Sequence, residues 1–376
     1  MKHPIYFPWS INKFVDLQEC NNLRDFDTTF WSGTSAISHA RYGEDISPLE
    51  IYNDTDFVQT PELGADVGSF SYVTDLRSIE ILNHALKEDK KVIVFWSGGI
   101  DSTVILSSII KLWSKEDQQR VIVYLNDYSI IENPVFFYKH INNVLEFLIY
   151  NDKKLSPELL DNHIICDGEP ADKLWLVEVA LAYAQKYGTD KLNEKWPNHT
   201  FVDFLNFKIS NLSIANCCKI IERIDVNINS LNTELIKTTG DVFSWINFNF
   251  HYSGHVWKKY STIFADSGNA KSIDKYKKLY FPWFNSKQYQ QWAWSNSGKK
   301  AKRLTNLQDY KSDAKEYIYD LTKDVNLLKF QTKMGSKPHS GWGKVNYVVY
   351  NNGECVAIND SNGVELFQSI IKLTPI

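Results

Sequence analysis

The chain has 376 residues, of which 43% are hydrophobic and 23% are charged, and its formal net charge is −4. This length can bury a core in one large or two medium domains, and the small net charge excludes a general attraction to nucleic acid. No apolar run reaches the roughly 18 residues that a membrane-spanning helix needs, and the five cysteines lack CxxC spacing, which argues against a zinc site or a disulfide framework. We therefore expect a cytoplasmic protein without a membrane partner.

The N-terminal region, residues 1–75, is rich in Asp, Asn, Ser, Thr and Gly with interspersed aromatic residues. This composition predicts irregular or β-type structure.

Apolar strand-like runs then alternate with helical patterns up to about residue 187. We expect strands at 91–96, 120–125 and 163–166, and helices at about 75–88, 102–114, 133–149 and 171–187. This alternation predicts an α/β fold with a parallel sheet and flanking helices, in which ligands bind beyond the carboxyl ends of the strands.

The pattern changes near residue 195. Aromatic-rich helical segments are expected at about 201–226, 228–262, 286–297 and 308–321, followed by a C-terminal β-hairpin turned at Asn352-Gly353. We therefore divide the chain into an N-terminal region (1–75), a nucleotide-binding α/β core (76–195), a mainly α-helical substrate subdomain (196–340) and a C-terminal hairpin (341–376).

The most informative motif is SGGIDST at residues 97–103, between a buried strand and a helix. Glycines let the backbone approach a phosphate closely, and the helix N-terminus favours an anion. The hydroxyl groups of Ser97, Ser102 and Thr103 add donors, while the Asp101 carboxylate is suited to Mg²⁺. The alternative is a plain strand-to-helix turn.

This pattern, SGGxDS without the Lys of a Walker loop, resembles the loop motif of the PP-loop ATP pyrophosphatase superfamily. The resemblance implies a Rossmann-like fold of the adenine nucleotide alpha hydrolase-like kind, with ATP and Mg²⁺ as cofactors. The residues it places against ATP and pyrophosphate lie on the loop and at neighbouring strand ends: Ser97, Gly98, Gly99, Asp101, Ser102, Thr103, Leu125, Gly168 and Glu169.

A second turn, CDGEPAD at 166–172, resembles the SGExxDE turn of asparagine synthetases, in which an acidic residue helps to hold Mg²⁺ and pyrophosphate. Gly168, Glu169 and Asp172 match, whereas Lys173 stands where an acid is usual. The resemblance implies metal ligation by Asp101 and Asp172. The alternative for Asp172 is a helix N-cap.

Two later stretches also resemble the synthetase domain of asparagine synthetases. FPWFN at 281–285 is similar to a PFLD segment, with a packing role. The stretch 310–336, which begins with Tyr310-Lys311, is similar to a Lys-bearing helix and loop, and it implies that Lys333 stabilises charge as the amine attacks, with Asp101 as the other catalytic residue. Gln331 stands where Arg is common, and the alternative for Lys333 is a solvated side chain.

The leading hypothesis is an Mg²⁺-ATP-dependent carbon–nitrogen ligase that activates a carboxylate or carbonyl as an adenylate, releases pyrophosphate and forms an amide or amidine. Its substrates are a small-molecule carboxylate and an amine. Lys2 replaces the nucleophilic cysteine of a glutaminase domain, so we expect free ammonia, an amine or a separate glutaminase as the nitrogen source.

Two alternatives stay open. A nucleobase- or tRNA-modifying enzyme would use the basic cluster 299–303, although a solvated loop is the other interpretation of this cluster. A thiolating enzyme would need reactive cysteines, and we expect Cys217 and Cys218 to be core residues. A non-catalytic nucleotide-binding scaffold is the second alternative. We expect His251 and His255, which have no acidic residue nearby in the sequence, to be structural.

Overall fold

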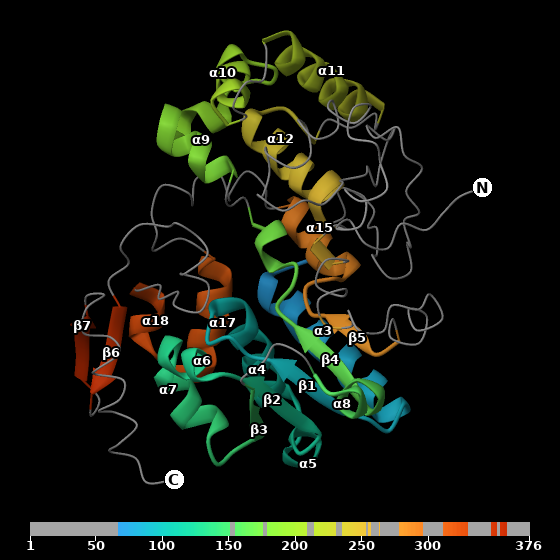
Figure 1. Ribbon diagram of the computed structural model, residues 1–376, viewed down its shortest axis with the longest axis vertical. Coiled ribbons are helices and arrows are strands. Elements are labelled where there is room, and N and C mark those ends of the chain that lie inside the picture. The colour runs from blue at the N-terminus through green and yellow to red at the C-terminus, as the bar shows by residue number, and fades with distance from the viewer. Residues whose placement is uncertain are drawn as a thin grey trace. The chain divides into compact units, whose positions relative to one another are not determined.

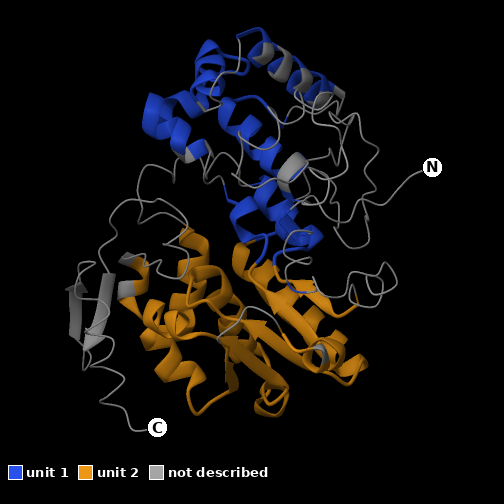
Figure 2. Cartoon of the chain, in the orientation of Figure 1, with its two compact units in different colours: residues 1–68, 169–269, 284–310 blue, residues 69–168, 270–283, 311–376 orange. Residues whose placement is uncertain are grey.

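The structure is a computed structural model that describes residues 67–150, 155–175, 179–208, 214–230, 235–252, 255–256, 263, 278–295, 311–329, 347–351 and 354–358 (Figure 1). The chain forms two compact units, and each of them is built from three separate segments of the sequence (Figure 2). Unit 1 comprises residues 1–68, 169–269 and 284–310, and unit 2 comprises residues 69–168, 270–283 and 311–376. The expected N-terminal region is outside the described residues up to position 66.

Unit 2 contains a five-stranded sheet in which every pair of neighbouring strands is parallel. The spatial order is β3-β2-β1-β4-β5. The strands are β1 (Lys91–Phe95), β2 (Val121–Leu125), β3 (Glu146–Ile149), β4 (His163–Asp167) and β5 (Tyr280–Pro282). Together with the helices that flank it, this sheet confirms the predicted α/β class.

The central strand β1 explains why the sheet forms here. Val92, Ile93 and Val94 are fully buried, and Val92 pairs with Val121 on one side and Ile164 on the other. A continuous apolar run of this kind is typical of a parallel strand covered on both faces.

Helices surround this sheet. They are α3 (Phe70–Lys87), α4 (Ile100–Leu112), α5 (Lys115–Gln118), α6 (Asp127–Glu132), α7 (Pro134–Phe136), η1 (Phe137–Ile141), α8 (Pro157–Asn162), α17 (Ser312–Thr322) and α18 (Val325–Lys329). Of these, α3, α4 and α17 contact one another. They bring α17, which lies about 200 residues further along the chain, next to the helix that begins within the SGGIDST motif.

Three differences from the expected elements concern unit 2. The helix expected at 133–149 ends at Ile141, and an exposed edge strand, β3, follows. The segment FPWFN begins within β5, which the sequence prediction missed. The helix expected from residue 75 begins at Phe70, because the Ser69 hydroxyl accepts a hydrogen bond from the amide of Tyr72 and caps it.

The described part of unit 1 is helical. Its elements are η2 (Ala171–Lys173), α9 (Val179–Tyr187), η3 (Thr189–Asn193), α10 (His199–Lys208), α11 (Ile214–Ser230), α12 (Thr239–Ile246), η4 (Asn247–His251) and α15 (Lys287–Ser295). The single helix expected at 228–262 is wrong, because Thr238 and Asp241 form a capping box that starts α12 at Thr239.

An aromatic cluster forms the core of unit 1. Tyr183, Phe204 and Phe243 are buried with ring centroids 5.1–5.9 Å apart in edge-to-face arrangements. Such pairs are favourable beyond the area they bury. The same core contains further buried aromatic residues, among them Trp245 and Trp294.

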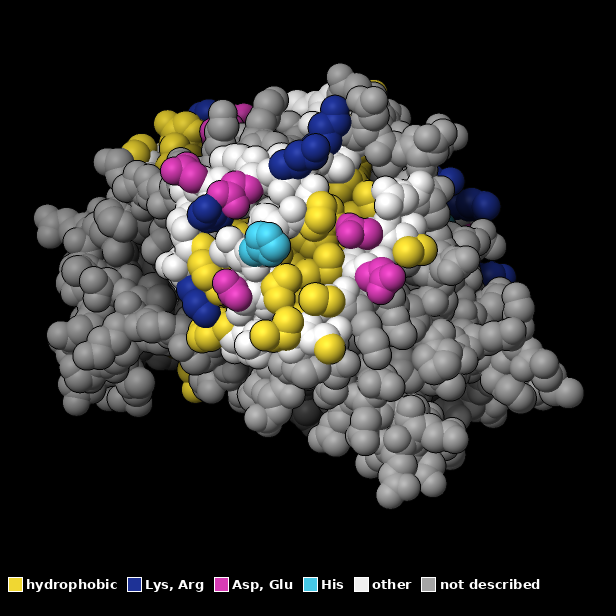
Figure 3. Space-filling view, turned by 90° about the horizontal axis from the view of Figure 1, so that it is seen from above, with side chains coloured by type: hydrophobic (Ala, Val, Ile, Leu, Met, Phe, Trp, Pro, Cys, Tyr) yellow, Lys and Arg dark blue, Asp and Glu magenta, His cyan; other side chains and the backbone are white. Residues whose placement is uncertain are grey.

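Figure 3 shows one face of the molecule on which hydrophobic side chains gather beside a histidine, with Asp and Glu side chains around them. Phe207 and Ile214, which are 60% and 65% exposed, are among the exposed hydrophobic residues of unit 1. Among the described helices, none is long and apolar enough to cross a membrane.

The expected C-terminal hairpin is confirmed as two antiparallel strands, β6 (Tyr347–Asn351) and β7 (Glu354–Ile358). Its turn residues, Asn352 and Gly353, lie outside the described residues.

Candidate functional site

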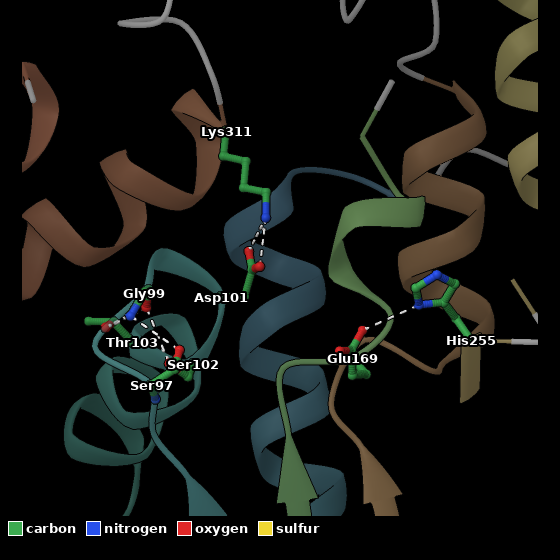
Figure 4. A network of polar contacts seen from close by, with 8 residues as sticks. All are labelled: Ser97, Gly99, Asp101, Ser102, Thr103, Glu169, His255 and Lys311. Atoms are coloured by element: carbon green, nitrogen blue, oxygen red, sulfur yellow. Dashed lines mark hydrogen bonds and ion pairs between the residues drawn. The ribbon is translucent and has the colours of Figure 1, made fainter. Parts of the chain in front are cut away.

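The loop between β1 and α4 is held by its own hydroxyl groups (Figure 4). The amide of Ser97 donates to Ser102 Oγ at 3.1 Å, and the amide of Gly99 donates to Ser97 Oγ at 3.3 Å. Thr103 Oγ1 donates to the Gly99 carbonyl at 2.8 Å and accepts the indole N–H of Trp96 at 3.0 Å. Ser102 and Thr103 are buried, and their hydroxyl groups maintain the turn. Ser97 is exposed.

The helix that follows the loop begins without a side-chain cap. Its N-cap residue is Gly99, and no side-chain hydrogen bond closes this end of α4. By contrast, Ser69 caps α3, Asn126 caps α6 and Ser156 caps α8. The N-terminus of a helix with uncapped amide groups favours an anion.

Two glycines of the loop lie close to α6. Gly98 has φ +79°, and a Cβ there would be 2.8 Å from the Cβ of Glu132. A Cβ on Gly99 would be 3.4 Å from Glu132 Oε1. A side chain at Gly98 would collide with α6, so packing alone gives a reason for glycine at this position.

The first carboxylate of the site, Asp101, forms an ion pair with Lys311 (Figure 4). The Lys311 Nζ lies 2.6 Å from both carboxylate oxygens of Asp101. The Lys311 side chain is 3% exposed and that of Asp101 is 26% exposed. The amine is therefore shielded from solvent, while one side of the carboxylate stays accessible.

Lys311 comes from the start of α17, which is fixed to α3 and α4. The Tyr317 hydroxyl donates to Asp75 Oδ1 at 2.5 Å, and Lys111 Nζ lies 3.2 Å from Asp75 Oδ2. Lys311 belongs to the C-terminal motif whose resemblance to asparagine synthetases implies the catalytic role for Lys333. Lys333 and the basic cluster 299–303 lie outside the described residues.

The end of β4 is fastened to β5. The Tyr280 hydroxyl donates to the buried Asp167 carboxylate at 2.8 Å, and the amide of Trp283 donates to the Asp167 carbonyl at 2.9 Å. The buried Arg77 of α3 donates to the carbonyls of Pro282 and Trp283, both at 2.9 Å. This anchor, which the sequence analysis did not find, fixes the strand end that leads into Gly168.

Gly168 follows β4 and Leu125 ends β2, and these two strands lie on either side of β1 in unit 2. A Cβ on Gly168 would lie 3.1 Å from the Cβ of Asp101, so Gly168 and the SGGIDST motif are in direct contact. Leu125 is fully buried at the end of β2, and its carbonyl accepts the amide of Tyr150 at 2.9 Å. The structure thus brings together the loop, Asp101 and Gly168.

Two other expected site residues, Glu169 and Asp172, belong to unit 1. Asp172 lies in η2. Glu169 Oε2 lies 3.8 Å from Nδ1 of His255, an acidic neighbour that local sequence gave no sign of (Figure 4). The described residues contain no group of three or more His, Cys, Asp or Glu side chains arranged to hold a metal ion.

Cys166, Cys217 and Cys218 are free thiols. Burial raises the pKa of Cys166 well above its usual range and also raises the pKa of Cys217. Cys218 is exposed, so the expectation that both adjacent cysteines are core residues is wrong for Cys218. A raised pKa disfavours the nucleophilic thiolate at Cys166 and Cys217.

The donor set of unit 2 fits a magnesium–polyphosphate complex. Mg²⁺ is commonly held by one or two carboxylates together with substrate phosphates, and Asp101 supplies such a carboxylate beside an uncapped helix N-terminus. Comparison with protein-family models, with curated proteins and with solved structures finds no match to the chain.

Proposed function

We propose that the protein is an Mg²⁺-ATP-dependent carbon–nitrogen ligase of the asparagine synthetase-like type, with a PP-loop fold of the adenine nucleotide alpha hydrolase-like kind. The observation that carries the proposal is the sequence SGGIDS between β1 and α4, with Asp101 in contact with Gly168 at the next strand end. A topological position of this kind is where open α/β sheets bind ligands.

Each residue of this site has a separate task in the proposal. The amide groups at the start of α4 bind pyrophosphate as it leaves, and Gly98 and Gly99 allow the loop to approach it. Asp101 would hold Mg²⁺, which neutralises phosphate charge when bound. A substrate carboxylate attacks the α-phosphorus of ATP, pyrophosphate leaves, and an amine then displaces AMP from the acyl-adenylate.

Lys333 has the second role in this proposal. Its ammonium group would stabilise the negative charge that develops on the acyl oxygen as the amine attacks. Asp172 would be a further oxygen ligand for Mg²⁺. Free ammonia, an amine or the product of a separate glutaminase would supply nitrogen.

The test is ATP–[³²P]pyrophosphate exchange, screened over amino acids, small carboxylic acids and total tRNA. Exchange that requires a small acid supports the ligase, whereas exchange that requires tRNA would support a tRNA-modifying enzyme instead. The Asp101→Asn variant serves as the inactive control. A wild-type chain that binds Mg²⁺-ATP but catalyses no exchange with any of these substrates would favour a scaffold and contradict the proposal.

A further inference from the structure

The two side chains of the Lys311–Asp101 ion pair differ in their exposure to solvent. Both carboxylate oxygens lie 2.6 Å from one Nζ atom, so the ammonium group bridges the two oxygens. The lysine side chain is 3% exposed, but the carboxylate is 26% exposed. An incoming cation can therefore approach the carboxylate from its accessible side, while the ammonium group stays shielded from water.

The backbone places Lys311 here at some cost. Its φ is +52°, in the left-handed region that residues with a side chain rarely adopt. Backbone of this kind persists where surrounding structure enforces it, and the contact between Tyr317 and Asp75 fixes the following turns of α17. Lys311 is held at the carboxylate by the fold, not by a flexible side chain that happens to meet it.

A shielded ammonium group needs an anionic partner, because burial of an unpaired charge is strongly unfavourable. Asp101 is such a partner in this structure. When a divalent cation binds the same carboxylate, the ammonium group and the metal repel each other, and a further anion close to both cations offsets this repulsion. A polyphosphate on the adjacent loop is an anion of the right kind, since lysine binds phosphate as a point charge.

We propose that Lys311 holds the place of the divalent cation at Asp101 and becomes a ligand of the pyrophosphate group once the cation binds. This inference rests on the proposed function, because it takes the loop to be the pyrophosphate site. It makes Lys311 a residue with two successive partners, each of them anionic. It also implies that metal binding and polyphosphate binding are coupled through one side chain.

The proposal predicts opposite effects of one substitution on two ligands. In Lys311→Met, the metal no longer competes with an ammonium group, so Mn²⁺ alone should bind about tenfold more tightly than to the wild type. Pyrophosphate in saturating Mg²⁺ should bind about tenfold more weakly, because one charged ligand is lost. Mn²⁺ binding is measured by electron paramagnetic resonance, and pyrophosphate binding by calorimetry.

The matched control is Lys91→Met. Lys91 also pairs with a carboxylate, that of Glu146 at 2.7 Å, in the same unit, but the Lys91 side chain is 45% exposed and lies at the start of β1, the end of the strand opposite the loop. This variant should bind both ligands as the wild type does. If Lys311→Met weakens Mn²⁺ binding, or leaves both affinities unchanged, the pair is a purely structural contact and the proposal is overturned.

A second variant keeps the test decisive if Lys311→Met does not fold. In Lys311→Arg the guanidinium group can hold both carboxylate oxygens at once, so Mn²⁺ should bind more weakly than to the wild type. Unchanged or tighter Mn²⁺ binding by Lys311→Arg would contradict the proposal. A wild-type chain that binds no pyrophosphate would instead contradict the proposed function, and the inference with it.

Discussion

Gly98 lies so close to Ser129 that a Cβ atom on the glycine would be 2.3 Å from the backbone carbonyl oxygen of Ser129. The same glycine has φ +79°. Two constraints therefore act on one position: a backbone conformation that disfavours a side chain, and a neighbouring backbone that leaves no space for one. Ser129 cannot move independently, because its amide and hydroxyl groups both bond to Asn126 in the capping box of α6.

We expect Gly98→Ala to destabilise the fold by about 3 kcal/mol, because positive φ costs about 1 kcal/mol for alanine and the clash adds the rest. The matched control is Gly188→Ala. Gly188 has φ +94° but no atom within 4 Å of its Cβ position, so this variant should lose only about 1 kcal/mol. Urea unfolding measures both, and equal losses would show that α6 yields to the new methyl group.

Asp101→Asn should abolish pyrophosphate exchange and also reduce stability. The amide cannot neutralise the shielded ammonium group of Lys311, which we expect to cost about 2 kcal/mol. The double variant Asp101→Asn/Lys311→Met should recover part of this loss, because no buried charge remains. Normal exchange activity in Asp101→Asn would rule out the assignment of the loop as the ATP site.

The central strands and the loop could be predicted from the sequence because their signals are local. Val92, Ile93 and Val94 form a continuous apolar run, and the loop motif follows directly. β3 carries only a short apolar run, Phe147-Leu148-Ile149, which suits the end of the helix expected at 133–149 as well as it suits a strand. β5 has only three residues, too few for a pattern to stand out.

The contacts that build the site could not be predicted, because their partners are distant in the sequence. Lys311 and Asp101 are 210 residues apart, and Arg77 and Trp283 are 206 residues apart. Neither residue of these pairs carries a local sign of its partner. The pairing of His255 with Glu169 could not be predicted for the same reason, since the two residues are far apart in the sequence.

The products of turnover should be AMP and pyrophosphate in equal amounts. The loop SGGIDST lacks the lysine with which a Walker loop binds the β- and γ-phosphates. Nucleotide products separated by ion-exchange chromatography after a timed reaction give the answer. ADP and phosphate as the stoichiometric products would contradict the proposed chemistry.

Asp225 should make stability depend on pH. Burial raises the pKa of its carboxyl group, although the indole N–H of Trp196 donates to it and opposes this shift. The stabilising contribution of the protonated form is full below the unfolded pKa, about 3.9, and is lost as pH rises through the higher folded pKa. Asp225→Asn still accepts the indole hydrogen bond, so at pH 7 it should exceed the wild type by under about 1 kcal/mol. Urea unfolding at pH 3 and pH 7 measures this difference in stability, which should disappear at pH 3. An Asp225→Asn variant less stable than the wild type at pH 7 would contradict the prediction.

Lys333→Ala should separate the two half-reactions. If the ammonium group acts on the attack of the amine, its loss should slow amide formation by about 3 kcal/mol in activation free energy while pyrophosphate exchange continues. The control is Lys323→Ala, since Lys323 follows α17 in the same unit and its side chain is 67% exposed. Both variants are assayed for exchange and for release of the amide product. If Lys333→Ala retains both activities, Lys333 is a surface residue, and Lys329 and Lys337 become the next candidates for the cation that stabilises the attack.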